Sequence, residues 1–305
     1  MIMDRRLQRR VQRYGWDLAA DAYEPLWQPL LAAAQAKLLA CAAPAPGERV
    51  LDVACGTGLV TFPALDLVGP NGEVVGIDLS AAMIGRARAR AARRNASNAK
   101  FERMDAEHLL LPDGGFDVCM CALGLMYTPD PEQALREMQR ATKPGGRVGL
   151  AVWGERSNCG WSSVFSIVDD EVKSEVCPLF FQLGQSNTLS QLCRKLGWGA
   201  VHEQRITTTL DHAGAQEACD AAFVGGPVAL AWSRFNDATK ERVRAKYLDS
   251  IDPWRSGLSF HVPAEFVVVT ATLPPGLDGQ LPAIAARIAQ VADREDSSSF
   301  GDESR

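Results

Sequence analysis

The sequence of 305 residues lacks an apolar run near the roughly 20 residues that a membrane-spanning helix needs, so it predicts no membrane span. Its N-terminus lacks the apolar core of a secretory signal. It also lacks an excess of basic charge, because 32 Lys and Arg stand against 37 Asp and Glu, for a formal net charge of −5. Proteins that bind nucleic acids usually present a basic face. We therefore expect a cytoplasmic protein with no nucleic-acid partner.

Pairs of cysteines at zinc-binding spacing are lacking as well. The eight cysteines are scattered, and the two closest, Cys119 and Cys121, fall inside an apolar stretch. Isolated thiols in a reducing compartment pack as small hydrophobic groups. We expect reduced cysteines and no metal site; a soft-metal or arsenic site built from a few of them is the alternative. Five arginines in the first thirteen residues are expected to form a solvated helix face or a frayed end.

What the sequence does contain is a regular alternation of strands and helices. The expected strands are 49–53, 74–77, 100–104, 116–121 and 147–153, and the expected helices between them are 59–68, 80–94 and 132–141. This alternation is typical of parallel strands with helices on both faces of the sheet. Strands are also expected at 201–210 and 265–273, and helices at 16–41, 214–224, 237–250 and 281–292. Pro25 and Pro29 are expected to interrupt the first helix.

A glycine-rich turn, Gly56-Thr57-Gly58, directly follows the first of these strands and opens a helix. Asp78 ends the next strand, where an acid can bind the two hydroxyls of a ribose. These features also fit a nicotinamide dinucleotide. Asp52, just before the turn, can accept a hydrogen bond from a ligand ammonium but would repel a pyrophosphate. Asp105, which closes the third strand, can accept the adenine amino group, so the pattern favours S-adenosylmethionine over a dinucleotide.

At this point the segment from about 14 to 153 resembles the class I S-adenosylmethionine-dependent methyltransferases. It looks closest to the small-molecule branch that includes the ubiquinone/menaquinone C-methyltransferases. The motifs that carry the resemblance are Leu51–Gly58, Gly76–Met83, Met104–Glu107, Leu111–Asp117 and Lys143–Gly146. The resemblance implies an α/β fold with a Rossmann-like seven-stranded, mostly parallel sheet, helices on both faces, an antiparallel last strand and helical cap insertions.

The resemblance also implies a division of the chain. Residues 1–45 would form an N-terminal helical lid. Residues 46–275 would form the methyltransferase domain, with acceptor-cap insertions at about 154–200 and 211–262. Residues 276–305 would form a C-terminal helix and a tail whose acidic, Ser-rich composition predicts disorder. The sequence is compatible with a monomer or a homodimer.

The residues that would bind S-adenosylmethionine, and its product S-adenosylhomocysteine, follow from the matched motifs. They are Asp52, Ala54, Gly56 and Gly58 for the methionine part, Asp78 for the ribose, Leu79, Met83, Asp105 and Ala106 for the adenine, Cys121, Ala122 and Leu123 beneath the sulfonium, and Tyr23 in the lid. Many relatives carry glycine where this chain has Ala54, and the alanine methyl requires a compatible backbone angle.

The acceptor side is less legible in the sequence, because in-line methyl transfer requires alignment and exclusion of water more than a dedicated catalytic group. Aromatic residues at or beyond the strand ends are the acceptor candidates: Trp27, Tyr127, Trp153 and Trp161. They would suit an apolar or cyclic acceptor. His212 and Tyr127 are weak candidates for a base.

No Asn/Asp-Pro-Pro-Tyr/Phe motif follows the fourth strand, where Ala122-Leu123-Gly124-Leu125 stands instead. That motif marks many methyltransferases that act on amide or base nitrogens, so carbon or oxygen acceptors are favoured over nitrogen or sulfur. The alternatives are a non-catalytic binding protein on the same fold and, with less support, an NAD(P)-dependent oxidoreductase, which would lack a Tyr-x-x-x-Lys pair.

Overall fold

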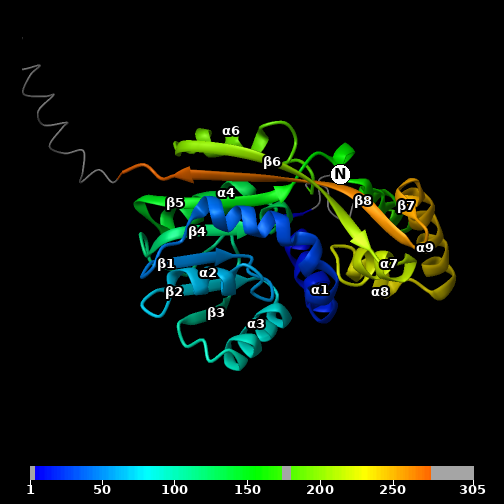
Figure 1. The fold of residues 1–305 in the computed structure, drawn as a ribbon, viewed down its shortest axis with the longest axis horizontal. Helices are drawn as coiled ribbons and strands as arrows, with labels where there is room; N and C mark the ends of the chain where they lie inside the picture. Colours follow the sequence, from blue (N-terminus) through cyan, green and yellow to red (C-terminus); the bar gives the residue numbers. More distant parts are fainter. Residues whose placement is uncertain (1–3, 174–179, 276–305) are drawn as a thin grey trace, which may run out of the picture.

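The computed structural model of the protein describes residues 4–173 and 180–275. The helix expected at 281–292, the tail and Cys177 lie outside the described residues. One sheet organises the rest, with strand order β3-β2-β1-β4-β5-β8-β6 (Figure 1). The strands are β1 (Arg49–Val53), β2 (Glu73–Asp78), β3 (Ala99–Arg103), β4 (Phe116–Ala122), β5 (Thr142–Trp153), β6 (Gly199–His212), β7 (Arg255–Ser256) and β8 (Ser259–Thr272).

The first five strands are parallel, and β8 is antiparallel to both of its neighbours, β5 and β6. This confirms the predicted seven-strand sheet with an antiparallel last strand; the two-residue β7 pairs with β8 outside that path. The carboxyl ends of parallel strands lie at the same end of the sheet, so the polar residues that follow different strands come close together there. The glycine turn and Asp78 therefore meet, although they belong to different strands.

Helices cover both faces of the sheet, as the alternation predicts. They are α1 (Arg5–Ala42), α2 (Thr61–Val68), α3 (Ala81–Arg93), α4 (Pro131–Ala141), α5 (Ser163–Val172), α6 (Thr188–Lys195), α7 (Ala215–Phe223), α8 (Ala229–Arg234) and α9 (Asp237–Ile251). Alternate residues of β1 enter two separate buried clusters: Val50 packs with α2 and α3, whereas Leu51 packs with α4. This two-sided burial explains why the strands are apolar throughout rather than alternating.

The expected interruption of the first helix is wrong, because α1 continues through Pro25 and Pro29 for 38 residues. Both prolines lie on the exposed side of the helix, so the carbonyls that lose a partner there can be solvated. The residues that follow, among them Trp27, Leu31 and Ala34, are buried against the sheet. Packing therefore holds the helix together, and Figure 1 shows its two halves running in different directions, as expected for a proline bend.

The antiparallel pair β6 and β8 is longer than predicted. Pairing between them continues from Gly199 with Thr272 to His212 with Phe260, whereas β5 pairs only with residues 266–272 of β8. The pair therefore extends beyond the sheet, and Figure 1 shows α7, α8 and α9 gathered at its far end. The segment 154–200 contains α5, α6 and the short 3₁₀ turns η2 (Arg156–Asn158) and η3 (Gly160–Ser162). The sequence had not predicted α8.

Cysteines and membrane spans can be assessed over the same described ranges. The seven cysteines that the structure describes are free thiols. Within residues 4–173 and 180–275, no three or more His, Cys, Asp or Glu side chains are grouped so that they could hold a metal ion. No helix in these ranges has both the length and the apolar character needed to cross a bilayer.

Candidate functional site

The turn between β1 and α2 places backbone, rather than side chains, at the carboxyl edge of the sheet. Ala54, Gly56 and Gly58 all have positive φ, at 57°, 55° and 88°. A Cβ atom on Gly58 would lie 2.6 Å from the ring of Phe62, so glycine is required there. Gly124, after β4, packs so closely on the turn that its Cβ would lie 2.2 Å from that of Ala54. The two segments thus form one compact wall.

Asp78 ties this wall to the start of α3. Its Oδ2 accepts a hydrogen bond of 2.9 Å from the Gly56 amide, and its Oδ1 accepts one of 2.8 Å from the Ser80 amide. Ser80 in turn caps α3 by accepting a bond from the Met83 amide. Burial raises the pKa of Asp78 to about 6. The carboxyl group is therefore held in place before any ligand arrives.

Asp52 lies closer to the core and is only 1% exposed. Its Oδ2 accepts a hydrogen bond of 2.5 Å from the Thr61 hydroxyl, whereas its Oδ1 has no hydrogen-bond partner among the described residues. Burial raises the pKa of this carboxyl to about 7. A buried oxygen without a partner is costly, and a ligand with a donor group would relieve that cost.

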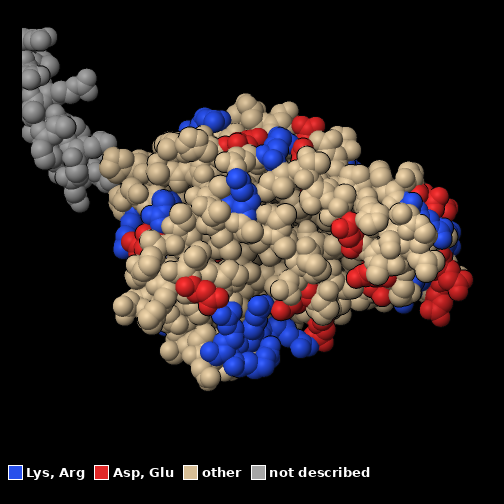
Figure 2. Space-filling view, viewed as in Figure 1, with Lys and Arg blue, Asp and Glu red and all other residues tan. Residues whose placement is uncertain are grey.

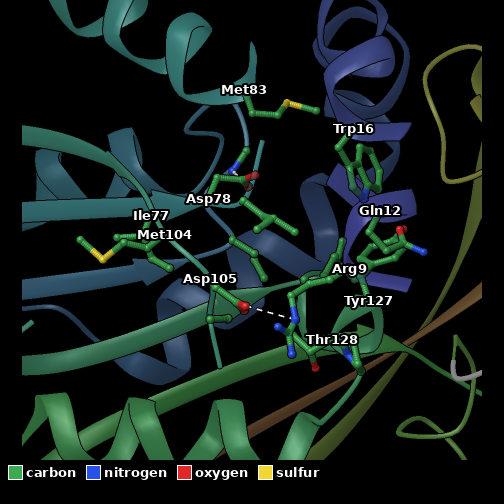
Figure 3. A pocket seen from close by; sticks show the side chains of 18 of the residues that line it. Arg9, Gln12, Trp16, Ile77, Asp78, Met83, Met104, Asp105, Tyr127 and Thr128 are labelled. Carbon is green, nitrogen blue, oxygen red and sulfur yellow. Dashed lines mark hydrogen bonds and ion pairs between the residues drawn. The ribbon is translucent and has the colours of Figure 1, made fainter. Parts of the chain in front are cut away.

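A cavity of about 740 Å³ opens in front of this wall (Figure 3). Ten of the residues expected at the site line it: Tyr23, Ala54, Gly56, Asp78, Leu79, Met83, Asp105, Ala106, Ala122 and Tyr127. Leu123, also named from the sequence, is among the lining residues as well. Asp52, Gly58 and Cys121 are not. Its walls combine apolar side chains with the two carboxyl groups of Asp78 and Asp105, a combination that suits a nucleoside.

The sequence missed several lining residues, of which Arg9 is the most consequential. Arg9 reaches from α1 so that its Nη2 lies 2.9 Å from Oε2 of Glu107 and its Nε lies 3.2 Å from Oδ2 of Asp105, the latter pair drawn in Figure 3. Its side chain is 27% exposed, and that of Glu107 only 2%. The expectation that the N-terminal arginines form a solvated face or frayed end is thus wrong for Arg9. No local pattern could have found it, since its partners lie almost a hundred residues away.

Other lining residues that were not assigned come from α1 and from the segments after the strands: Gln12, Trp16, Ile77, Met104, Gly124, Thr128 and Pro129. Trp16 packs edge-on against Tyr23 and Tyr127, with ring centroids 5.6 and 5.1 Å apart. The first half of α1 therefore forms a complete wall of the cavity. The role of this segment as a lid, expected from the sequence, stays a prediction.

Basic residues on α3 hold that half of α1 in place. Figure 2 shows Lys and Arg side chains gathered over α3. Arg86 pairs with Asp21 and Arg90 pairs with Glu24, both on α1. Asp17 of α1 also accepts a hydrogen bond of 2.6 Å from the Ser80 hydroxyl. Charge pairing, rather than apolar packing alone, therefore joins α1 to α3, the helix that follows Asp78.

A second cavity of about 290 Å³ adjoins the first. Its lining residues are Trp16, Tyr23, Trp27, Leu31, Leu123, Tyr127, Trp153, Trp161 and Pro227. Four of them, Trp16, Tyr23, Leu123 and Tyr127, also line the first cavity. All four acceptor candidates from the sequence, Trp27, Tyr127, Trp153 and Trp161, therefore come together here. None of the nine lining residues carries a charge.

The two candidate bases differ in position. Tyr127 lines both cavities. His212 ends β6, is buried and lines neither cavity; burial lowers its pKa. The structure therefore gives no support to His212 as a base. Tyr23 lies where burial and the carboxyls of Asp78 and Asp52 raise the pKa of its hydroxyl, which keeps it protonated.

Comparisons with known proteins agree with this geometry. A family model described as a methyltransferase domain matches residues 44–194. The ubiquinone/menaquinone biosynthesis C-methyltransferase UbiE of Ectopseudomonas mendocina is 46% identical over 37% of this chain and 44% of its own length. The protein of the same name from Stutzerimonas stutzeri is 32% identical over 60% of this chain and 71% of its own length. The chain spans about half the length of the first curated relatives that it matches.

Among solved structures, the YcgJ protein of Bacillus subtilis superposes with a TM-score of 0.56, covering 80% of this chain and 100% of that one. The two are 17% identical. At that identity the likeness shows the fold alone.

Proposed function

The chain belongs to the S-adenosylmethionine-dependent methyltransferases, and from that premise we propose that it methylates a small-molecule acceptor at carbon or oxygen. The observation that carries the proposal is the pair of adjoining cavities with shared walls. The first has the acids and apolar walls suited to the methyl donor, and the second is aromatic and uncharged. A donor and an acceptor placed in them would meet at the shared residues Leu123 and Tyr127.

The residues of the first cavity fit S-adenosylmethionine. Asp78, held by two backbone amides, would accept hydrogen bonds from the ribose hydroxyls. Asp105 and the Ala106 amide would bind the adenine edge, and Leu79 and Met83 would pack on its faces. The Oδ1 atom of Asp52 is a buried acceptor without a partner among the described residues. The ammonium group at the methionine end of the ligand would supply a hydrogen-bond donor for it. Gly58 and Cys121 would support this end from behind the lining residues.

When bound, S-adenosylmethionine supplies an activated methyl group, which passes to the acceptor by in-line displacement. The contribution of this chain is to hold both partners and exclude water. Trp16, Tyr23 and Tyr127 line both cavities, so they would orient the acceptor. Their ring faces favour positive charge and would stabilise the sulfonium. Tyr127 is the one base candidate that lines the cavities, and the reaction does not require it.

The named relatives methylate carbon in ubiquinone and menaquinone biosynthesis, which supports a carbon acceptor on a ring for this chain. We further propose that the protein acts in the cytoplasm, without nucleic acid, as a monomer or a homodimer. The cofactor is expected to leave as S-adenosylhomocysteine.

The test is calorimetric titration with S-adenosylmethionine and S-adenosylhomocysteine. We expect micromolar binding that falls at least about tenfold in Asp78→Ala, since a buried charged hydrogen-bond acceptor is lost. Asp249→Ala, an exposed position on α9, is the matched control and should bind like the wild type. Absence of binding by folded wild-type protein would sink the proposal. Turnover of labelled donor with any acceptor would exclude a purely binding role.

A further inference from the structure

Among the residues that the structure describes, Trp161 carries a buried hydrogen-bond donor without a partner. The side chain is 1% exposed, and its Nε1 has no hydrogen-bond partner among the described residues. Two other buried tryptophans are paired: Trp27 Nε1 donates to the Ala221 carbonyl and Trp198 Nε1 donates to Gln139, each at 3.1 Å. Leaving a buried N–H unpaired is costly, so buried indoles usually find an acceptor. A ligand oxygen within reach of this N–H would therefore relieve that cost.

The position of Trp161 in the second cavity indicates the shape and size of the ligand that could supply this oxygen. Trp161 lies in the cap turn η3 and lines the second cavity, beside Trp153 and Trp27 with ring centroids 4.7 and 5.6 Å away. Six of the nine lining residues are aromatic, a surface on which another planar ring packs well. This cavity is the smaller of the two, with about 290 Å³ of empty space against about 740 Å³, so the ring system is small.

Resting on the methyl-transfer function proposed above, we propose that Trp161 selects the acceptor by donating its indole N–H to an oxygen of a neutral, planar ring compound. A carbonyl or hydroxyl oxygen satisfies the donor, and the ring fills the aromatic walls. The oxygen anchors the ring at Trp161, and the rest of the ring extends toward the walls that both cavities share. The cap turn thus determines which ring atom is presented to the donor.

Two other ligand classes fit this cavity less well. An organic cation would be attracted by the ring faces, but it has no acceptor and would leave the Trp161 N–H unpaired. An anion would accept that bond, but none of the nine lining residues carries a charge to offset its desolvation. A neutral ring with an oxygen satisfies both the donor and the uncharged walls.

The experiment compares two probes that differ only in the acceptor atom: acetophenone, with a carbonyl, and ethylbenzene, with a methylene in its place. Wild-type protein labelled with ¹⁵N and saturated with S-adenosylhomocysteine is titrated with each, and the indole N–H signals are followed. The Trp161 signal is assigned by its loss in Trp161→Phe. We expect it to move downfield with acetophenone and not with ethylbenzene. We also expect acetophenone to bind about fivefold more weakly to Trp161→Phe, as for one lost hydrogen bond, while ethylbenzene is unaffected.

Trp153→Phe, the same change on the same cavity, is the control and should alter the affinities for both probes equally. The inference is overturned if acetophenone does not bind, if it leaves the Trp161 signal in place, or if Trp161→Phe weakens both probes alike. Tight binding of phenyltrimethylammonium that Trp161→Phe leaves unchanged would replace it with a cation site. Binding of S-adenosylhomocysteine is measured on the same samples. If S-adenosylhomocysteine does not bind, the proposed methyl-transfer function is wrong. If it binds but the protein does not discriminate between the two probes, only the inference about Trp161 is wrong.

Discussion

At the scale of single residues, the site depends on backbone that can approach closely and on carboxyls that are buried before a ligand binds. Ala54 holds a left-handed backbone angle, and Gly124 leaves just enough room for its methyl group. Gly124 has a φ of −108°, which any residue adopts. Glycine is therefore required at position 124 because the Ala54 methyl group lies so close, and not because of the backbone angle.

Gly124→Ala should accordingly destabilise the protein by about 1–3 kcal/mol through overpacking and weaken binding of S-adenosylhomocysteine. Adding Ala54→Gly removes the methyl that clashes and should recover much of the loss, leaving Cys121 Sγ at 3.2 Å as the nearest atom. Denaturant unfolding of the two single variants and the double variant measures the coupling. Gly85→Ala, in α3, is the control: nothing lies within 4 Å of its added Cβ, so it should be stabilising. Simple additivity of the two changes would contradict the packing described here.

The buried carboxyls predict a pH dependence whose sign follows from their raised pKa values, about 7 for Asp52 and about 6 for Asp78. Between the ordinary pKa of an Asp and these values, the folded ligand-free protein binds more protons than the unfolded chain. The stability contributed by these groups is therefore present at low pH and lost as the pH rises through 6 and 7. A ligand that donates hydrogen bonds favours the carboxylates, so S-adenosylhomocysteine should bind about tenfold or more weakly at about pH 5.5 than at about pH 7.5.

Asp52→Asn tests this link directly, because the amide is neutral at every pH. We expect it to raise the unfolding free energy of the ligand-free protein at about pH 8 by about 1–3 kcal/mol, and to flatten the pH dependence of binding near pH 7. Thermal unfolding and calorimetry across the pH range give both quantities. A variant that is less stable than the wild type at that pH would show that Asp52 is not strained by its burial.

At the scale of elements, α1 acts as a wall that is pinned by charge at several points. Arg9 joins it to the loop after β3, Asp17 joins it to the cap of α3, and Arg90 of α3 joins Glu24. The Arg9 pair is the one that lies inside the cavity, and it engages Asp105, the acid assigned to adenine. The lid and the adenine loop are therefore mechanically coupled.

Replacing Arg9 by Met should free the start of α1 and leave the buried Glu107 without its charge partner. We expect a loss of about 1–2 kcal/mol in stability, reduced from a fully buried pair because Arg9 is partly exposed, and weaker binding of S-adenosylhomocysteine. Hydrogen exchange should speed up in the first half of α1. Arg10→Met, at an exposed position on the same helix, should change neither. Equal effects of the two variants would mean that general charge, and not this pair, holds the lid.

At the scale of the whole molecule, the two cavities share part of α1 and differ in the rest of their lining. The first is completed by the ends of the parallel strands and the turns after them. The second is completed by Trp153 at the end of β5, by Trp161 and by Pro227. The family model ends at residue 194, before the long β6–β8 pair that carries α7 to α9. None of the residues that line the first cavity comes from α7, α8 or α9, so we expect ligand binding there to leave these helices unaffected.

Saturating S-adenosylhomocysteine should therefore protect the molecule unevenly. At a hundredfold excess over Kd it should stabilise the protein by about 2.7 kcal/mol. Locally, we expect slower hydrogen exchange in the first half of α1, in the turn after β1 and at the start of α3. Helix α9 should exchange by its own local opening, unchanged by the ligand. Uniform protection that includes α9 would contradict this division, and Asp78→Ala should show weaker protection at the same ligand concentration.

The sequence by itself determined the features that lie close together along the chain. The glycine turn after β1, the acid that ends β2 and the alternation of strands and helices are local patterns, and the structure confirms the fold that they predicted. Most of the expected cofactor residues line the first cavity for the same reason, because parallel strands bring their carboxyl ends to one edge whatever lies between them. Their roles in binding stay predictions.

Only the tertiary structure decided the features that join distant segments. It carried α1 through its two prolines, since packing of Trp27 and its neighbours outweighs the local cost of a lost hydrogen bond. It paired Arg9 with acids almost a hundred residues away, excluded His212 from the cavities and gathered the four aromatic acceptor candidates, Trp161 among them, around the second cavity. An unpaired indole N–H cannot be read from a sequence, because whether a buried donor is satisfied depends on every group that surrounds it in space.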